Sequence, residues 1–271
     1  ANIQEIPNIP DQVDMDINVV EKPTGSVNLS AGYSSTDKVV LGAGIQQDNV
    51  FGTGTSLGLN INTSKVNRTL SLTQYDPYFT LDGISRVTDL YYKTSQPFYY
   101  LNDPSYKIVT QGGSFKFGVP FSEVDRVFFG LGLEQMNVGT SSSNSTPNLV
   151  AFVKEFGSKV IDIPFTVGWA KDNRDSALVP TTGRYQQANI ELGTPAGNLQ
   201  YYRFSYQHQY YYPIAKGYTL AFNTEIGYGH GYHGDSFPMI KNYLAGGIGS
   251  VRGYETNTIG PYSTMTQTDG T

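Results

Sequence analysis

Apolar and polar residues alternate along most of this chain, in runs of about ten residues separated by turn-forming residues. Leu57, Leu59 and Ile61 are interleaved with polar or small residues, and the same period recurs around 39–46, 114–119, 161–169, 202–207 and 220–228. A period of two places apolar side chains on one face of a strand and polar ones on the other. The pattern predicts antiparallel β-structure in about eleven strands, starting near residues 26, 39, 55, 69, 84, 106, 126, 160, 184, 200 and 218.

Two features favour a transmembrane β-barrel over a soluble β-sandwich, which stays the alternative. The polar faces are rich in Gly, Ser, Asn and Gln, as a barrel lumen is, and aromatic residues gather at strand ends, as at membrane interfaces. These aromatics are Tyr75, Tyr78, Phe79, Tyr91, Tyr92, Tyr210, Tyr211, Tyr212 and Tyr218. The predicted fold class is all-β, a partial antiparallel barrel. Its outward-facing residues are expected to include Leu57, Leu59, Phe115, Phe117, Phe165 and Phe222.

The connections between the predicted strands alternate in length. Those near 79–83, 122–125 and 214–217 are tight, whereas those near 96–106 and 139–158 are long and polar. Short turns on one side and long loops on the other are typical of the periplasmic and outer faces of an outer-membrane barrel. Residues 149–156 fit either a short amphipathic helix or a strand.

Composition supports this class and excludes others. Charged residues make up 15% of the 271 residues, against roughly 25% in soluble domains, and aromatics reach 13%. The chain has no cysteine, and its net charge is -5 with no Lys/Arg cluster, which argues against a nucleic-acid partner. No run approaches the ~18 apolar residues of a membrane helix.

Both ends depart from the strand pattern. Residues 13–19 alternate before a stop at 21–23, which predicts one soluble strand and a hinge. From about Tyr232 onward some forty residues show no alternation, and runs of this length are usually functional or disordered. This run holds the glycines Gly246, Gly247 and Gly249 and then the motif Val251, Arg252, Gly253 and Tyr254. An Arg in such a setting either pairs with buried carboxylates or lies on a surface loop.

Candidate catalytic and metal sites are weak. His230, His233 and Asp235 could form part of a metal site, but polar residues on a strand rim are the favoured interpretation. Asp172 and Asp175 fit a solvated turn better than a cation site. No GxSxG, HExxH or P-loop motif occurs. We therefore expect no enzyme, no cofactor, no metal and no catalytic residue.

Several segments, in order, resemble the BamA-type insertases of the bacterial outer membrane, a family of POTRA domains followed by a 16-stranded barrel. The opening 13–21 is similar to the last strand of a POTRA domain, a periplasmic module. Residues 46–54, 76–83 and 180–183 resemble three of the family's periplasmic turns. The most specific likeness is 245–247 leading to Val251-Arg252-Gly253-Tyr254 and then 257–261. This resembles the family's Val-Arg-Gly-Phe/Tyr motif, in a sixth outer loop that folds into the lumen.

The resemblance implies a domain division and partners. Residues 1–24 would be the last POTRA strand and hinge, and 25–271 the first part of the barrel, ending within the sixth outer loop at about 232–271. Since later strands and other POTRA domains are missing, the chain is expected to be a fragment. The implied location is the outer membrane with the N-terminal end in the periplasm. The implied partners are outer-membrane lipids, unfolded client proteins and periplasmic lipoproteins.

The implied function is insertion and folding of outer-membrane proteins through a weak lateral seam at the first strand. That strand carries Ser26, Val27, Asn28, Leu29, Ser30, Ala31, Gly32 and Tyr33, with few bulky apolar residues and a glycine. Such a strand pairs weakly and leaves an edge that can open. Secretion transporters of the same superfamily share the Arg motif and stay an alternative. A passive porin-type channel is a weaker alternative, and a barrel-embedded hydrolase has no supporting feature.

Overall fold

The computed structural model describes residues 2–5, 13–20, 23–34, 38–96, 107–139, 147–247, 249–254 and 258–261. Its strands are β1 (Asn2–Glu5), β2 (Val13–Asp16), β3 (Gly25–Ser34), β4 (Lys38–Gln47), β5 (Ser56–Thr63), β6 (Asn67–Asp76), β7 (Ser85–Ser95), β8 (Lys107–Pro120), β9 (Asp125–Gly139), β10 (Lys159–Asp162), β11 (Pro164–Asp172), β12 (Gly183–Gly193), β13 (Tyr201–Ala215) and β14 (Tyr218–Gly231). Its helices are α1 (Pro147–Phe156) and the 3-10 turns η1 (Val50–Gly52) and η2 (Met239–Lys241).

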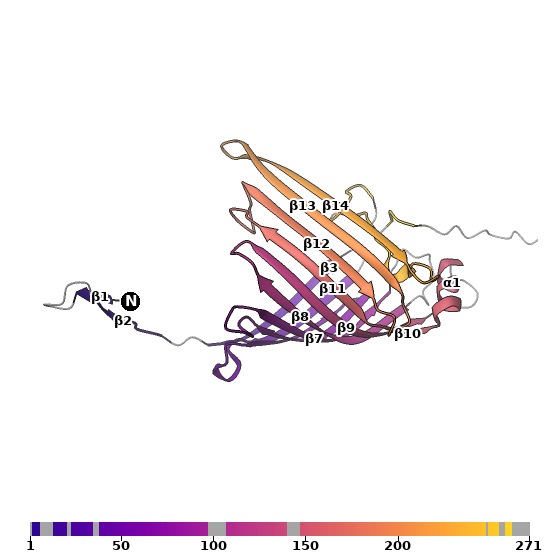
Figure 1. Ribbon diagram of the computed structural model, residues 1–271, viewed down its shortest axis with the longest axis horizontal. Helices are drawn as coiled ribbons and strands as arrows, with labels where there is room; N and C mark the ends of the chain where they lie inside the picture. The colour runs from indigo at the N-terminus through magenta and orange to yellow at the C-terminus, as the bar shows by residue number, and fades with distance from the viewer. Residues whose placement is uncertain are drawn as a thin grey trace, which may run out of the picture.

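Strands β3 to β14 form one antiparallel sheet in which each strand pairs with its neighbours in sequence, except that β10 and β11 both pair with β9. The sheet curls, so that the N-terminal strands lie behind the wall of β8 to β14 (Figure 1). Among the described residues β3 and β14 are the two edges and do not pair with each other. The predicted succession of about eleven strands is confirmed.

The strand expected near residue 160 is interrupted. Its two parts, β10 and β11, both pair with β9 and keep one register, with Asp162 opposite Glu134 and Phe165 opposite Leu131. The break falls at Ile163 and Pro164. Proline has no backbone N–H to donate to the ladder, and the Ile163 carbonyl instead accepts a bond from Thr194 N at 3.1 Å.

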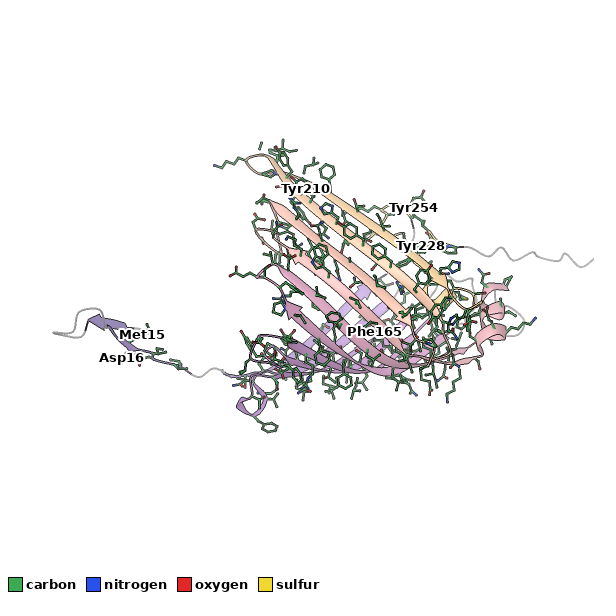
Figure 2. All side chains as sticks on the ribbon, in the orientation of Figure 1. Met15, Asp16, Phe165, Tyr210, Tyr228 and Tyr254 are labelled. Atoms are coloured by element: carbon green, nitrogen blue, oxygen red, sulfur yellow. The ribbon has the colours of Figure 1, made fainter. Side chains whose placement is uncertain are left out.

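The apolar face can be followed across the sheet, because directly opposed residues share a face. Two rows of apolar residues cross the sheet. One is Val27, Ile45, Leu59, Leu72 and Leu90, on β3 to β7, and the other is Phe115, Leu131, Phe165, Leu192 and Tyr202, on β8 to β13. All ten side chains are exposed. Figure 2 shows Phe165 on the wall among these strands.

The opposite face carries mostly polar or small side chains. One of its rows runs through Asn28, Gly44, Asn60, Ser71, Tyr91, Gly112 and Glu134. The chain after β14 packs on this face, against β12, β13 and β14. The polar face is therefore the inner one. The six residues expected to point outward lie on the apolar face, although Phe117 is half-buried beside Phe79, with ring centroids 5.7 Å apart.

The aromatic residues at strand ends do not all lie on the outer face. Tyr91 donates to Glu134 and lies on the inner face, and the registers place Tyr75 and Tyr211 there as well. The interpretation of these three as interface residues was wrong. Alternation decides their face, and the density of aromatics in the sequence does not reveal which side each occupies.

The three turns predicted to be tight, near 79–83, 122–125 and 214–217, lie at one end of the sheet, which we call the short-turn end, and the opposite end is the loop end (Figure 1). At the loop end, the segment that fitted a helix or a strand is α1, which begins at Pro147, a residue pre-organised for the first helical turn. Leu149 and Phe152 are its buried residues. No described helix has the length and apolarity needed to cross a membrane.

The first described residues stand apart from the sheet as a hairpin of β1 and β2 (Figure 1). The strand expected at 13–19 covers Val13–Asp16 only, and 17–20 carries no strand. Its assignment to a POTRA domain stays a prediction.

A charge on the apolar face should destabilise the barrel. We expect Leu59→Lys, in the middle of β5, to cost ~2–4 kcal/mol of folding free energy in a bilayer, because lysine at the midplane is poorly solvated. Asn60→Lys, one position along and on the inner face, is the matched control and should cost much less. Unfolding in urea with vesicles present measures both. Equal losses for the two variants would contradict the assignment of faces.

Candidate functional site

The predicted sixth outer loop begins where β14 ends. Its described residues, 232–247, 249–254 and 258–261, contain only the short turn η2 and one bridge between Ala245 and Ile259. The sequence-based expectation of a long connection without strands holds for these residues. These described residues fold back over the inner face of the sheet.

Two inward-facing glycines of β14 allow the loop to approach the wall closely. A Cβ at Gly227 would lie 2.8 Å from the Tyr243 ring, and one at Gly229 would lie 2.4 Å from the Phe237 ring. The Tyr243 hydroxyl donates to the Phe204 carbonyl at 2.8 Å, and Arg203 lies over its ring. The glycine-rich inner face is thus a seat for loop aromatics.

Around Met239 of the loop, an apolar cluster closes the loop end of the sheet. Its buried members come from β9, α1, β10, the β12–β13 connection, β13 and η2: Met136, Val138, Leu149, Phe152, Val160, Leu199, Tyr201 and Met239. Phe237 and Ile240 pack against it. One hydrogen bond ties α1 to the loop directly, from Ser236 N to Glu155 Oε1 at 2.7 Å.

A buried ionic cluster lies beside these apolar residues. Lys241 Nζ is 2.8 Å from Asp162 Oδ2 and 3.0 Å from Glu191 Oε1, and the Tyr201 hydroxyl bonds both carboxylates. Asp162 is fully buried, and the Lys241 side chain is 13% exposed. Burial lowers the pKa of Lys241, but the nearby Glu191 and Asp162 carboxylates outweigh it and raise the pKa above its ordinary value. The lysine therefore stays charged in this setting.

The motif singled out in the sequence follows a tight turn. Gly246 and Gly247 are buried with φ of 115° and 91°, a region that favours glycine. Gly247 N bonds the Tyr254 carbonyl at 3.0 Å, and Ala245 and Ile259 exchange two bonds of 2.8 Å. These backbone bonds between residues before and after the motif therefore hold the two ends of the motif segment close together.

The motif side chains point away from these contacts. Val251, Arg252, Gly253 and Tyr254 are exposed, as is Gly249, and Tyr254 is placed beyond β14 in Figure 2. Within the part of the chain that is described, Arg252 makes no hydrogen bond or ion pair. Its pairing with carboxylates of later strands stays a prediction.

The predicted seam strand is β3. Its residues Ser26 to Tyr33 are all exposed, and β3 pairs only with β4 among the described strands. A Cβ at Gly32 would meet no atom within 4 Å. The seam strand and the loop motif are thus not brought together, since β3 forms one edge of the sheet and the loop packs on β12 to β14 at the other.

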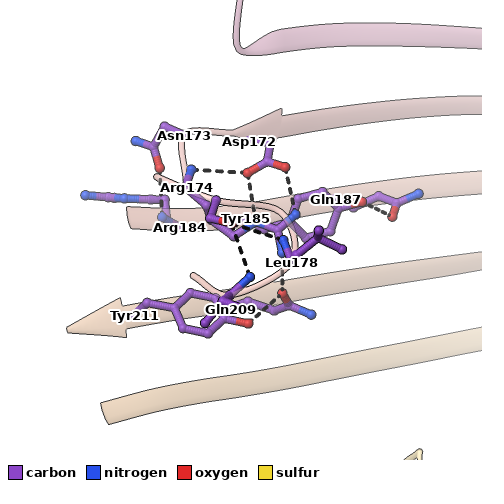
Figure 3. A network of polar contacts seen from close by, with 11 residues as sticks. Asp172, Asn173, Arg174, Leu178, Arg184, Tyr185, Gln187, Gln209 and Tyr211 are labelled. Atoms are coloured by element: carbon purple, nitrogen blue, oxygen red, sulfur yellow. Dashed lines mark hydrogen bonds and ion pairs between the residues drawn. The ribbon is translucent and has the colours of Figure 1, made fainter. Parts of the chain in front are cut away.

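A polar network organises the β11–β12 turn at the short-turn end (Figure 3). Arg174 forms a two-pronged pair with Asp172, at 2.9 and 2.7 Å, and lies over the Tyr185 ring. The amides and the hydroxyl of the Thr181–Thr182 segment bond Asp175 and lower its pKa to about 2. Asp172 and Asp175 thus stabilise the β11–β12 turn through these hydrogen bonds. No cluster of three metal-ligating side chains occurs among the described residues.

The sequence did not reveal the ionic cluster. Lys241 is a single lysine in a mostly apolar stretch, and Asp162 and Glu191 are isolated acids at inward positions of distant strands. The alternation along the strands predicts that both acids face inward. Their contact with Lys241 depends on the path of the loop.

Comparison with known proteins agrees with this architecture. The model of the Omp85 superfamily domain matches residues 49–271. The outer membrane protein assembly factor BamA of Neisseria meningitidis is 40% identical over 93% of this chain and 33% of its own length. That of Nitratidesulfovibrio vulgaris is 24% identical over 93% of this chain and 31% of its own.

A solved structure supports the same relationship. The crystal structure of BamA from Haemophilus ducreyi lacking POTRA domains 1-3 superposes with a TM-score of 0.82 at 27% identity, over 96% of this chain and 51% of that one. This chain spans about a third of the length of the curated relatives. The curled antiparallel sheet, the inward-folded loop and these matches together show that the chain belongs to the Omp85 superfamily.

Proposed function

We propose that this chain is part of an outer-membrane assembly factor, whose barrel inserts and folds client outer-membrane proteins. The observation that carries the proposal is the similarity of this sheet to BamA proteins over nearly the whole chain. In the full-length protein we place the barrel in the outer membrane and the short-turn end, with residues 1–24, on the periplasmic side. Residues 1–24 would then contain the end of a POTRA domain.

The proposed mechanism needs no covalent chemistry. In the full-length protein β3 would pair with the strand that closes the barrel. Where that seam opens, the N–H and C=O groups of β3 can accept a client strand by β-augmentation, so that one set of backbone bonds replaces another. β3 is a suitable template because Ser26, Asn28 and Ser30 face inward and few side chains hold it in place. Client folding supplies the free energy, so the proposal includes no enzyme activity and no cofactor.

The proposed partners follow from this mechanism. They are outer-membrane lipids around the apolar rows, unfolded client proteins at β3, and periplasmic lipoproteins at the N-terminal side. A polypeptide secretion transporter is the second candidate, because such proteins share the Arg motif. Assembly is favoured because the relatives and the solved structure that this chain matches are assembly factors.

Reconstitution of the full-length protein distinguishes the two candidates. In lipid vesicles we expect it to accelerate the folding of an added unfolded outer-membrane barrel, seen as heat-modifiable mobility on gels. A soluble polypeptide offered in the same way should stay on the side to which it was added. Transport of that polypeptide without acceleration of barrel folding would overturn the assignment.

A further inference from the structure

We infer that the loop is fixed by two independent anchors, and that Lys241 with Asp162, Glu191 and Tyr201 forms the first of them. This inference concerns the positioning of the loop and does not depend on the proposed assembly activity. It assigns a role to residues outside the Val251–Tyr254 motif.

The charges of the cluster explain why Lys241 holds its position. Asp162 is fully buried, its Oδ1 atom has no hydrogen-bond partner among the described residues, and Glu134 lies opposite it in the ladder. A buried carboxylate without a cation is strongly unfavourable. Lys241 Nζ, within 3.0 Å of both Asp162 and Glu191, is the cation that the described structure brings to this place.

The cluster also links parts of the barrel that are far apart in sequence. Asp162 lies on β10, Glu191 on β12, Tyr201 on β13 and Lys241 in the loop. Charge-assisted bonds to Asp162 and Glu191, with the Tyr201 ring centroid 5.0 Å from Nζ, define one position for the lysine. The adjacent apolar cluster, through Met239, excludes water from the same spot.

The second half of the loop is seated differently. A cavity of about 480 Å³ lies between the wall of β12 to β14 and the segment that leads to the motif. Its lining includes Gln207 and Glu225 from the wall and Ser250 and Ile259 from the loop. The segment around Met239 and Lys241 is therefore packed, whereas the segment around Ser250 stands off the wall. The packing around Lys241 therefore does not extend to the motif segment, and we assign that segment to the second anchor, Arg252.

A cysteine reporter tests the inference in the full-length protein in its membrane. This chain has no cysteine, so in a full-length protein whose other cysteines, where present, are replaced by serine, Met239→Cys, at an 8% exposed position, reports opening of the first anchor by its rate of reaction with a maleimide. With Lys241→Met we expect labelling to speed up roughly tenfold or more, because Asp162 is left without its cation. When Asp162→Asn is added to Lys241→Met, the labelling rate of Met239→Cys should return most of the way to its value without these two changes. Lys154→Met, at an exposed position of α1, is the matched control and should change nothing.

Independence is tested with the same reporter. Arg252→Ala should leave labelling of Met239→Cys unchanged, whatever it does to assembly activity. Unchanged labelling in Lys241→Met, or equal acceleration by Arg252→Ala, would overturn the inference. If Lys241→Met yields no heat-modifiable barrel, Asp162→Asn alone decides. It removes one of the two negative charges that hold Lys241, and we expect a smaller acceleration than tenfold, whereas no acceleration would count against the cluster.

Discussion

Arg252→Ala should lower both barrel stability and assembly output in the full-length protein. The resemblance to BamA-type proteins implies that this arginine pairs with carboxylates on strands that follow the sixth loop, and we expect that pairing here. Removal of one partner of a desolvated pair costs roughly 3–5 kcal/mol, because the other charge stays buried without compensation. The measurement is the urea midpoint of the barrel, together with the folding rate of an added client.

The conservative variants sharpen this prediction. Arg252→Lys should rescue only in part, because lysine lacks the planar guanidinium that forms two parallel bonds to a carboxylate. Tyr254→Phe should be tolerated and Tyr254→Ala should not, if the ring packs against the lumen wall. Wild-type stability and output in Arg252→Ala would return the motif to the interpretation of an exposed surface loop, which is how Arg252 and Tyr254 lie among the described residues.

The strands and their faces were predictable because alternation is a local signal. Leu57 and Leu59 are on the apolar face as expected, since each strand obeys a period of two that no distant contact overrides. Phe117 shows the limit of this signal. Its face was predicted, but its cover by Phe79 depends on how the β6–β7 turn folds over the barrel rim.

The loop was predictable as a loop, and its contacts were not. Gly246 and Gly247 were singled out in the sequence as loop glycines, and the structure gives both a positive φ, which favours glycine. Lys241 meets Asp162 and Glu191 across 79 and 50 residues of sequence, as 241 − 162 and 241 − 191 show. A single sequence carries no pattern for such a meeting, because it depends on the curl of the sheet and the path of the loop together.

Closing the edge at β3 should abolish assembly. If client strands add to β3, a disulfide between β3 and the strand that closes the full-length barrel removes the free backbone groups that the client needs. The fold should survive, because the bond joins elements that are already neighbours in the closed state. Reduction should restore activity, since the thiols then allow the edge to open again.

A second disulfide within the described structure provides the matched control. Leu29 and Ala43 lie directly opposite each other on β3 and β4, at a separation suited to a disulfide. Leu29→Cys with Ala43→Cys staples β3 to the neighbour that it already has and leaves its outer edge free. This variant should assemble clients at nearly the wild-type rate in both redox states.

The direct test is client folding by the two stapled proteins, oxidised and reduced, in vesicles of outer-membrane lipids. We predict that the edge-closing disulfide reduces the rate to that of protein-free vesicles, that reduction recovers it, and that the β3–β4 disulfide has little effect. Undiminished client folding with the edge closed, at full disulfide formation, would show that assembly does not pass through β3.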